Sequence, residues 1–134
     1  MLIGIDPILT GEVLWALDQM GHGDVLVVED ANFPARRVGS QVIDLSGVSA
    51  AGAVKAVSTV FPFDLDEFLV LMRAPGGLNA VQSELVAACG LVKPQIDEVE
   101  RFGFYATAAT ASLILRTGET RPYGNILLRK GVVN

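Results

Sequence analysis

The chain has 134 residues, of which 51% are hydrophobic, and its formal net charge is −5. A chain of this length forms one domain with a sizeable core, so we expect a single domain over residues 1–134. The acidic charge argues against a nucleic-acid partner, and no apolar run approaches the roughly 20 residues that a membrane span needs.

The first half of the sequence predicts helices and strands in alternation. Thr10 is a candidate N-cap for a helix that extends to Met20, where Gly21 should end it in the left-handed conformation. Further elements are expected in this order: strand 25–28, loop 29–34, strand 41–45, and a helix from the N-cap Ser49 to about Val60.

The second half continues the alternation, with Phe102 and Phe104 expected in the core. Its expected elements are strand 68–72, turn 74–77, helix 79–88, strand 95–99, helix 102–111, and strands 113–115 and 126–128. Because loop 118–125 between the last two strands is short, we expect them to pair antiparallel, which makes the sheet mixed. The pattern predicts an α/β fold: a single layered domain with a mixed β-sheet flanked by helices.

His22 is the one histidine in the sequence, and it lies between Gly21 and Gly23, just before a buried strand. An imidazole gives and takes a proton at neutral pH, and flanking glycines let a ligand approach closely. The alternative is an exposed turn histidine. One histidine with scattered carboxylates lacks the ligand clustering of a zinc site, so we expect no metal and no cofactor.

Asp30 follows the strand at 25–28, and open α/β sheets bind ligands at the carboxyl ends of their strands. A carboxylate at this edge, with Asn32 nearby, suits sugar hydroxyls, although an Asx turn explains the same residues. Arg101 at a helix start opposes the helix dipole, which hints at another role. Tyr105 is expected to be structural.

Five segments resemble the L-fucose mutarotase / D-ribose pyranase family over essentially the whole chain. They are 4–7 (GIDP), 20–24 (MGHGD), 30–35 (DANFPA), 101–105 (RFGFY) and 117–131, which contains YGN at 123–125. Gly23 and Gly124 follow the fucose branch, because the ribose branch tends to threonine and alanine there. Segment 74–94 carries no matching motif.

The resemblance implies roles for individual residues. His22 falls on the catalytic proton donor, and Tyr123 could complete an acid/base pair. The sugar-binding positions are Asp30, Arg101, Tyr123, Gly124 and Asn125.

The resemblance therefore implies a cofactor-free isomerase that interconverts the α and β anomers of a monosaccharide, with L-fucose favoured. The alternatives are a pyranose/furanose interconversion of D-ribose and a sugar-binding oligomer without turnover. An apolar surplus indicates protein–protein interfaces, and the resemblance implies ring-like homo-oligomers, often decamers. The single cysteine, Cys89, excludes an internal disulfide and is expected in the core. With no leader pattern, a cytoplasmic location is expected.

Overall fold

The structure, a computed structural model, describes residues 1–39 and 41–134. The chain alternates helices and strands, as the sequence predicts. The helices are α1 (Gly11–Gln19), α2 (Ala35–Val38), α3 (Ala50–Ser58), α4 (Ala80–Ala88) and α5 (Arg101–Ala108). The strands are β1 (Val25–Glu29), β2 (Val42–Leu45), β3 (Leu69–Met72), β4 (Ile96–Val99), β5 (Leu113–Thr117) and β6 (Ile126–Arg129).

The helix starts follow their capping residues. The Thr10 side chain accepts a hydrogen bond from Val13 N–H at 3.3 Å, and Ser49 accepts one from Gly52 N–H at 3.0 Å. Each bond satisfies one of the free N–H groups of a first helical turn. Both predicted N-caps are therefore confirmed.

The six strands form one sheet in the order β2-β5-β1-β6-β3-β4. β1 is parallel to β5, β5 to β2, and β3 to β4, whereas β6 runs antiparallel to both β1 and β3. The predicted mixed sheet is confirmed. The five parallel strands end at one edge, and β6 begins there.

The predicted pairing of the last two strands is wrong. β5 and β6 run in opposite directions, but β1 lies between them and pairs with both. Loop 118–125 is longer than the two to five residues of common hairpin connections, so it can pass over the end of β1. A short loop therefore does not by itself make the two strands that it joins neighbours in the sheet.

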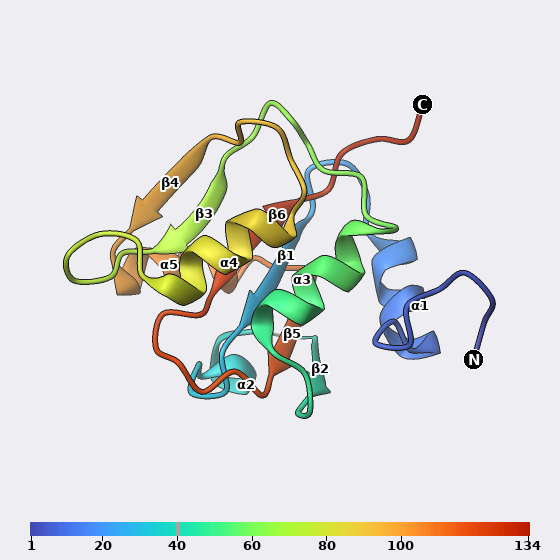
Figure 1. The fold of residues 1–134 in the computed structure, drawn as a ribbon, viewed down its shortest axis with the longest axis horizontal. Helices are drawn as coiled ribbons and strands as arrows, with labels where there is room; N and C mark the ends of the chain where they lie inside the picture. Colours follow the sequence, from blue (N-terminus) through green and yellow to red (C-terminus); the bar gives the residue numbers. More distant parts are fainter. Residues whose placement is uncertain (40) are drawn as a thin grey trace.

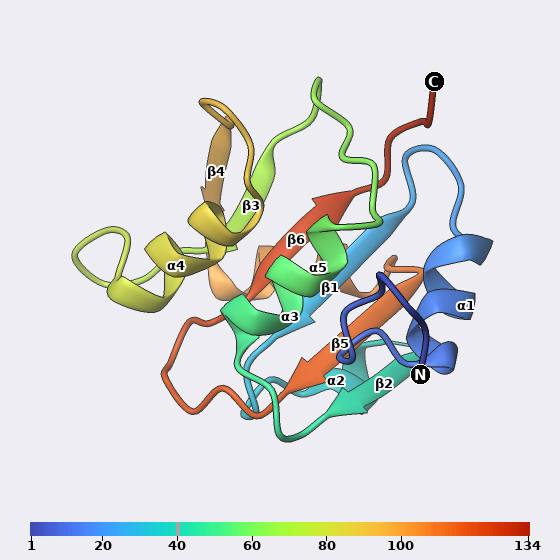
Figure 2. The same ribbon diagram turned by 45° about the vertical axis from the view of Figure 1, so that its right-hand side comes forward.

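Two layers of helices cover the sheet, with α3 and α4 in front and α2 and α5 behind it (Figure 1). α1 belongs to the same core layer as α3 and α4 (Figure 2). β1 supplies both layers, because Leu26 and Val28 pack with α3 while Val25 and Val27 pack against Phe104 of α5. Cys89 is buried in the first layer, as predicted.

Three local predictions need correction. Phe104 is fully buried but Phe102 is 64% exposed, because residues two apart on a helix point in different directions. α1 ends at Gln19, its C-cap Met20 is extended, and Gly23, rather than Gly21, has a positive φ of 85°. Glu29 belongs to β1 instead of the following loop, and α2 was not predicted.

Candidate functional site

A pocket of about 260 Å³ lies at the edge where the parallel strands end. Asp30 follows β1, Met72 ends β3, and Arg101 starts α5 directly after β4. Tyr123 and Asn125 enter from the loop that precedes β6. The pocket is smaller than typical sites for drug-sized ligands, at roughly 300–1,000 Å³, so it suits a small molecule.

Asp30 is buried at the base of this pocket, and backbone N–H groups fix its carboxylate. Oδ1 accepts a hydrogen bond from Asn32 N–H at 3.0 Å, and Oδ2 accepts one from Gly124 N–H at 3.2 Å. Burial raises the pKa of Asp30, while these hydrogen bonds act in the opposite direction. Asp30 therefore both forms an Asx turn with Asn32 and lines the pocket.

The tripeptide Tyr123–Asn125 is joined to Asp30 at two points. Besides the Gly124 contact, the Asn125 side-chain oxygen accepts a hydrogen bond from Asp30 N–H at 2.9 Å. This contact fixes the amide of Asn125 and leaves its Nδ2 donor for the pocket that the residue lines. Tyr123 has a φ of 63°, a left-handed conformation that is uncommon for a residue with a side chain.

Arg101 and two aromatic rings also line the pocket. The Arg101 side chain is exposed at the start of α5, where Glu100 caps the helix through Phe102 N–H and Gly103 N–H. Phe33 and Tyr105 pack edge to face, with ring centroids 5.2 Å apart, and both line the pocket. Tyr105, expected to be structural, therefore also contributes to the wall.

His22 lies away from this pocket. Its Nε2 is 3.0 Å from Asp64 Oδ2, and its side chain is 64% exposed, while that of Asp64 is 15% exposed. A hydrogen bond from Arg129 to the Gly23 carbonyl and one from Gly23 N–H to the Lys130 carbonyl hold the loop. The carboxylate of Asp64 therefore holds the imidazole in place.

The structure brings together five of the six predicted site residues, and His22 is the one that lies elsewhere. Asp30, Arg101, Tyr123 and Asn125 line one pocket, with Gly124 beside them. His22 precedes β1, whereas Asp30 follows it, and the five residues of β1 extend about 16 Å at ~3.3 Å per residue. The two loops lie at opposite ends of the strand in Figures 1 and 2.

Two residues were missed from the sequence: Glu29, which precedes Asp30 of the pocket, and Asp64, which contacts His22. Glu29 is fully buried, and neither of its carboxylate oxygens has a hydrogen-bond partner among the described residues. Burial, and secondarily Asp30, raises its pKa from 4.5 to about 9, so the group is neutral at pH 7. A glutamate at the end of an apolar strand was a visible signal. Asp64 gave no local signal, because it meets His22 only through tertiary structure.

The site has the chemistry of a polyol-binding pocket. A carboxylate acceptor, an amide donor, a guanidinium and a phenol surround a space walled by aromatic rings. Among residues 1–39 and 41–134 there is no cluster of three or more histidine, cysteine or acidic side chains placed to hold a metal ion. In the same part of the chain, no helix is both long and apolar enough to cross a membrane.

Residues 3–133 match the model of the RbsD / FucU transport protein family. The chain is 41% identical to an L-fucose mutarotase of Actinobacillus pleuropneumoniae serotype 5b, over 98% of this chain and 97% of the relative.

Solved structures show the same fold. The fucose mutarotase of Streptococcus pneumoniae, in complex with L-fucose, superposes with a TM-score of 0.89 at 29% identity, covering 99% of this chain and 100% of the other. FucU of Bifidobacterium longum gives a TM-score of 0.89 at 35% identity, covering 98% of this chain and 99% of the other.

Proposed function

Because the chain belongs to the RbsD / FucU transport protein family, we propose that it is a mutarotase, an isomerase that interconverts the α and β anomers of L-fucose. The observation that carries this proposal is the pocket at the carboxyl edge of the sheet. It gathers Asp30, Arg101, Tyr123 and Asn125 in a volume of about 260 Å³. The resemblance to mutarotases that act on L-fucose selects the sugar.

The reaction opens and recloses a hemiacetal ring. One group protonates the ring oxygen while another removes the proton of the anomeric hydroxyl, the C–O bond breaks, and the resulting aldehyde turns before reclosure. Only protons move to and from the protein, so general acid/base groups suffice. We assign this work to His22 and Tyr123. Asp30, Arg101, Gly124 and Asn125 bind and orient the sugar hydroxyls.

One subunit does not place His22 near the sugar pocket, because β1 separates the two. A site that contains both therefore requires two copies of the chain. We propose a homo-oligomer in which His22 of one subunit completes the pocket of its neighbour. The exposure of the His22 ring, 64%, is consistent with a group that acts outside its own subunit.

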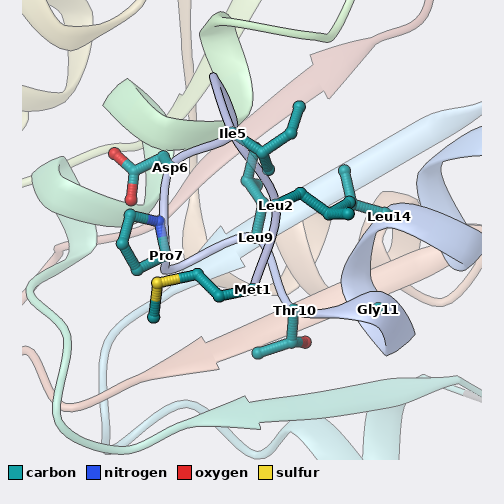
Figure 3. Close-up of a pocket in the computed structure, with 9 residues that line it drawn as sticks. All are labelled: Met1, Leu2, Ile5, Asp6, Pro7, Leu9, Thr10, Gly11 and Leu14. Carbon is teal, nitrogen blue, oxygen red and sulfur yellow. The ribbon is translucent and has the colours of Figure 1, made fainter.

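Apolar side chains on the surface support assembly. Met1, Leu2, Ile3 and Trp15 are exposed, although large apolar side chains are normally buried. The N-terminal segment and the start of α1 also enclose an apolar cavity of about 410 Å³, around which Figure 3 shows Met1, Leu2 and Leu14. A neighbouring subunit would cover this surface. We place the enzyme in the cytoplasm, where free thiols such as Cys89 stay reduced.

Saturation-transfer NMR on the equilibrium mixture of anomers tests the function. Catalytic amounts of the protein are expected to accelerate exchange between α- and β-L-fucose above the spontaneous rate. D-Ribose in the same assay reports the alternative pyranose/furanose reaction. Faster exchange of ribose than of fucose would transfer the assignment to ribose, and binding without exchange would leave only a sugar-binding protein.

A further inference from the structure

Helix α4 lies in the segment 74–94, which carries none of the matching motifs, yet its first turn contacts the pocket. Asn79 and Gln82 form a capping box, because the side-chain oxygen of each accepts a hydrogen bond from the backbone N–H of the other, at 3.0 and 3.1 Å. These bonds use only the oxygens of the two amides. Both side-chain nitrogens remain free to donate elsewhere.

The two amide nitrogens donate to backbone carbonyls of pocket residues. Asn79 Nδ2 lies 3.1 Å from the Pro122 oxygen, and Gln82 Nε2 lies 2.6 Å from the Met72 oxygen. Pro122 and Met72 both line the sugar pocket. Gln82 is completely buried, so its bond to β3 is shielded from water. The start of α4 therefore fixes two parts of the pocket wall.

Arg121 makes a second connection between α4 and the loop. Its two terminal nitrogens donate to the two carboxylate oxygens of Glu84, at 2.9 and 2.6 Å. Its Nε and one terminal nitrogen donate to the carboxylate of Glu119, at 2.9 and 3.1 Å. Arg121 lowers the pKa of both carboxyl groups. One guanidinium thus joins the helix to the buried beginning of the loop.

The contacts of Arg121 affect position more than global stability. The Arg121 and Glu84 side chains are 43% and 48% exposed, and exposed ion pairs contribute little to the free energy of unfolding. Glu119, by contrast, is buried and lies directly against the tripeptide. A Cβ built on Gly124 would be 3.0 Å from Glu119 Cγ. Because Glu119 lies this close to Gly124, we expect a shift of Glu119 to displace Gly124 and its neighbour Tyr123, whose left-handed conformation needs external support.

We propose that Asn79, Gln82, Glu84 and Arg121 are positioning residues that hold loop 118–125 in the conformation that presents Tyr123 and Asn125 to the sugar. We name these four residues the α4 clamp. This inference rests on the proposed function, because it concerns the same pocket. The clamp touches no reacting atom and acts through the loop.

The test compares Arg121→Ala, Glu84→Ala and the double variant in the complete protein. We expect kcat/KM for L-fucose exchange to fall about tenfold or more in each single variant, because small misplacements of binding groups slow catalysis strongly. The double variant should be no worse than Arg121→Ala alone, because both changes remove one connection. Arg121→Lys keeps the positive charge but loses the paired N–H donors of the guanidinium, so it should recover part of the activity. The melting temperature should change little.

Arg36→Ala is the matched control, because Arg36 also pairs with a carboxylate, Asp44 at 2.6 Å, but belongs neither to loop 118–125 nor to the pocket lining. It should keep the wild-type kcat/KM. In sugar-free protein, the backbone amide NMR signals of Tyr123 and Gly124 should shift in Arg121→Ala and Glu84→Ala but not in Arg36→Ala.

The two readouts separate the failure of the clamp from the failure of the function. Wild-type protein without any fucose exchange would overturn the proposed function, and the amide signals would still decide whether the clamp holds the loop. An active wild type with unchanged kcat/KM in Arg121→Ala and Glu84→Ala would overturn the clamp alone. Unshifted amide signals of Tyr123 and Gly124 would overturn it as well.

Discussion

Among the described residues, His22 has one side-chain hydrogen-bond partner, the carboxylate of Asp64, and most of its ring is exposed. His22→Gln should therefore keep the fold and the assembly while losing nearly all mutarotation, a loss of about 10²–10⁴-fold for one acid/base group. Saturation-transfer NMR on fucose anomers measures the loss, and circular dichroism with light scattering checks fold and mass. Unchanged exchange rates would remove His22 from the mechanism.

Glu29 makes stability depend on pH, because its pKa rises from 4.5 to about 9 in the folded protein. Between these two values the unfolded chain binds fewer protons at this position than the folded one, so the free energy of unfolding falls as the pH rises. Glu29→Gln should remove this dependence. Relative to wild type, the variant should gain stability steadily as the pH rises from 4.5 to about 9.

Urea unfolding of both proteins at several values between pH 5 and pH 9 measures this difference. Comparing slopes rather than single values cancels the cost of burying the glutamine amide, which is the same at every pH. Parallel curves for the two proteins would mean that Glu29 does not carry a raised pKa.

At the scale of elements, loop 118–125 is packed against the connection between β2 and α3. Gly118 N–H donates to the Val48 carbonyl at 2.8 Å, and a Cβ on Gly118 would lie 2.0 Å from the Ser46 carbonyl oxygen. This oxygen belongs to the backbone, so it cannot turn aside as a side chain would. The conformation of loop 118–125 therefore depends on a glycine at its first position.

Gly118→Ala should destabilise the fold by about 1–3 kcal/mol, the usual range for overpacking, and weaken fucose exchange by displacing the loop. Gly47→Ala is the control in the neighbouring connection, because a Cβ there meets nothing within 4 Å. Urea unfolding of both variants gives the comparison. Equal stability of the two would contradict the close approach of Gly118 to Ser46.

At the scale of the whole molecule, the separation of His22 from the pocket predicts sites shared between subunits. His22→Gln and Asn125→Ala should each be inactive as pure proteins. Subunits that are unfolded together and reassembled should regain part of the activity, because some sites then combine an intact His22 with an intact Asn125.

Light scattering should give a mass well above the 14.2 kDa of one chain. Two observations would rule out shared sites. One is a fully active monomer at dilute concentration. The other is a set of mixed assemblies that never recover turnover although both variants assemble together.

Much of the fold follows from local signals in the sequence. Thr10 and Ser49 mark helix starts because their side chains satisfy N–H groups within three residues. Apolar runs such as 25–28 predict buried strands, and this signal too is contained within a few neighbouring residues. Asn79 with Gln82 was a further visible signal, a capping box whose second contacts, to Pro122 and Met72, no sequence pattern displays.

Some features of the candidate site were predictable from the sequence, and others depend on the tertiary structure. The position of Asp30 after a strand predicted its place at the carboxyl edge, because parallel strands end together. The insertion of β1 between β5 and β6 was not predictable from loop length, since strand order depends on packing between residues 87 to 104 positions apart. That insertion joins Asp30 to Gly124 and Asn125. It also directs β1 so that His22 lies at the far edge of the sheet.

The sequence by itself determined the element types, the mixed α/β sheet and, through resemblance, the class of chemistry. Only the tertiary structure decided which residues share a pocket and that Glu29 is buried with no hydrogen-bond partner for its carboxyl group in the part of the chain that is described. The physical reason is the distance along the sequence over which each kind of interaction acts. Capping and periodicity act within a few residues, whereas burial and pocket geometry arise when distant segments pack against one another.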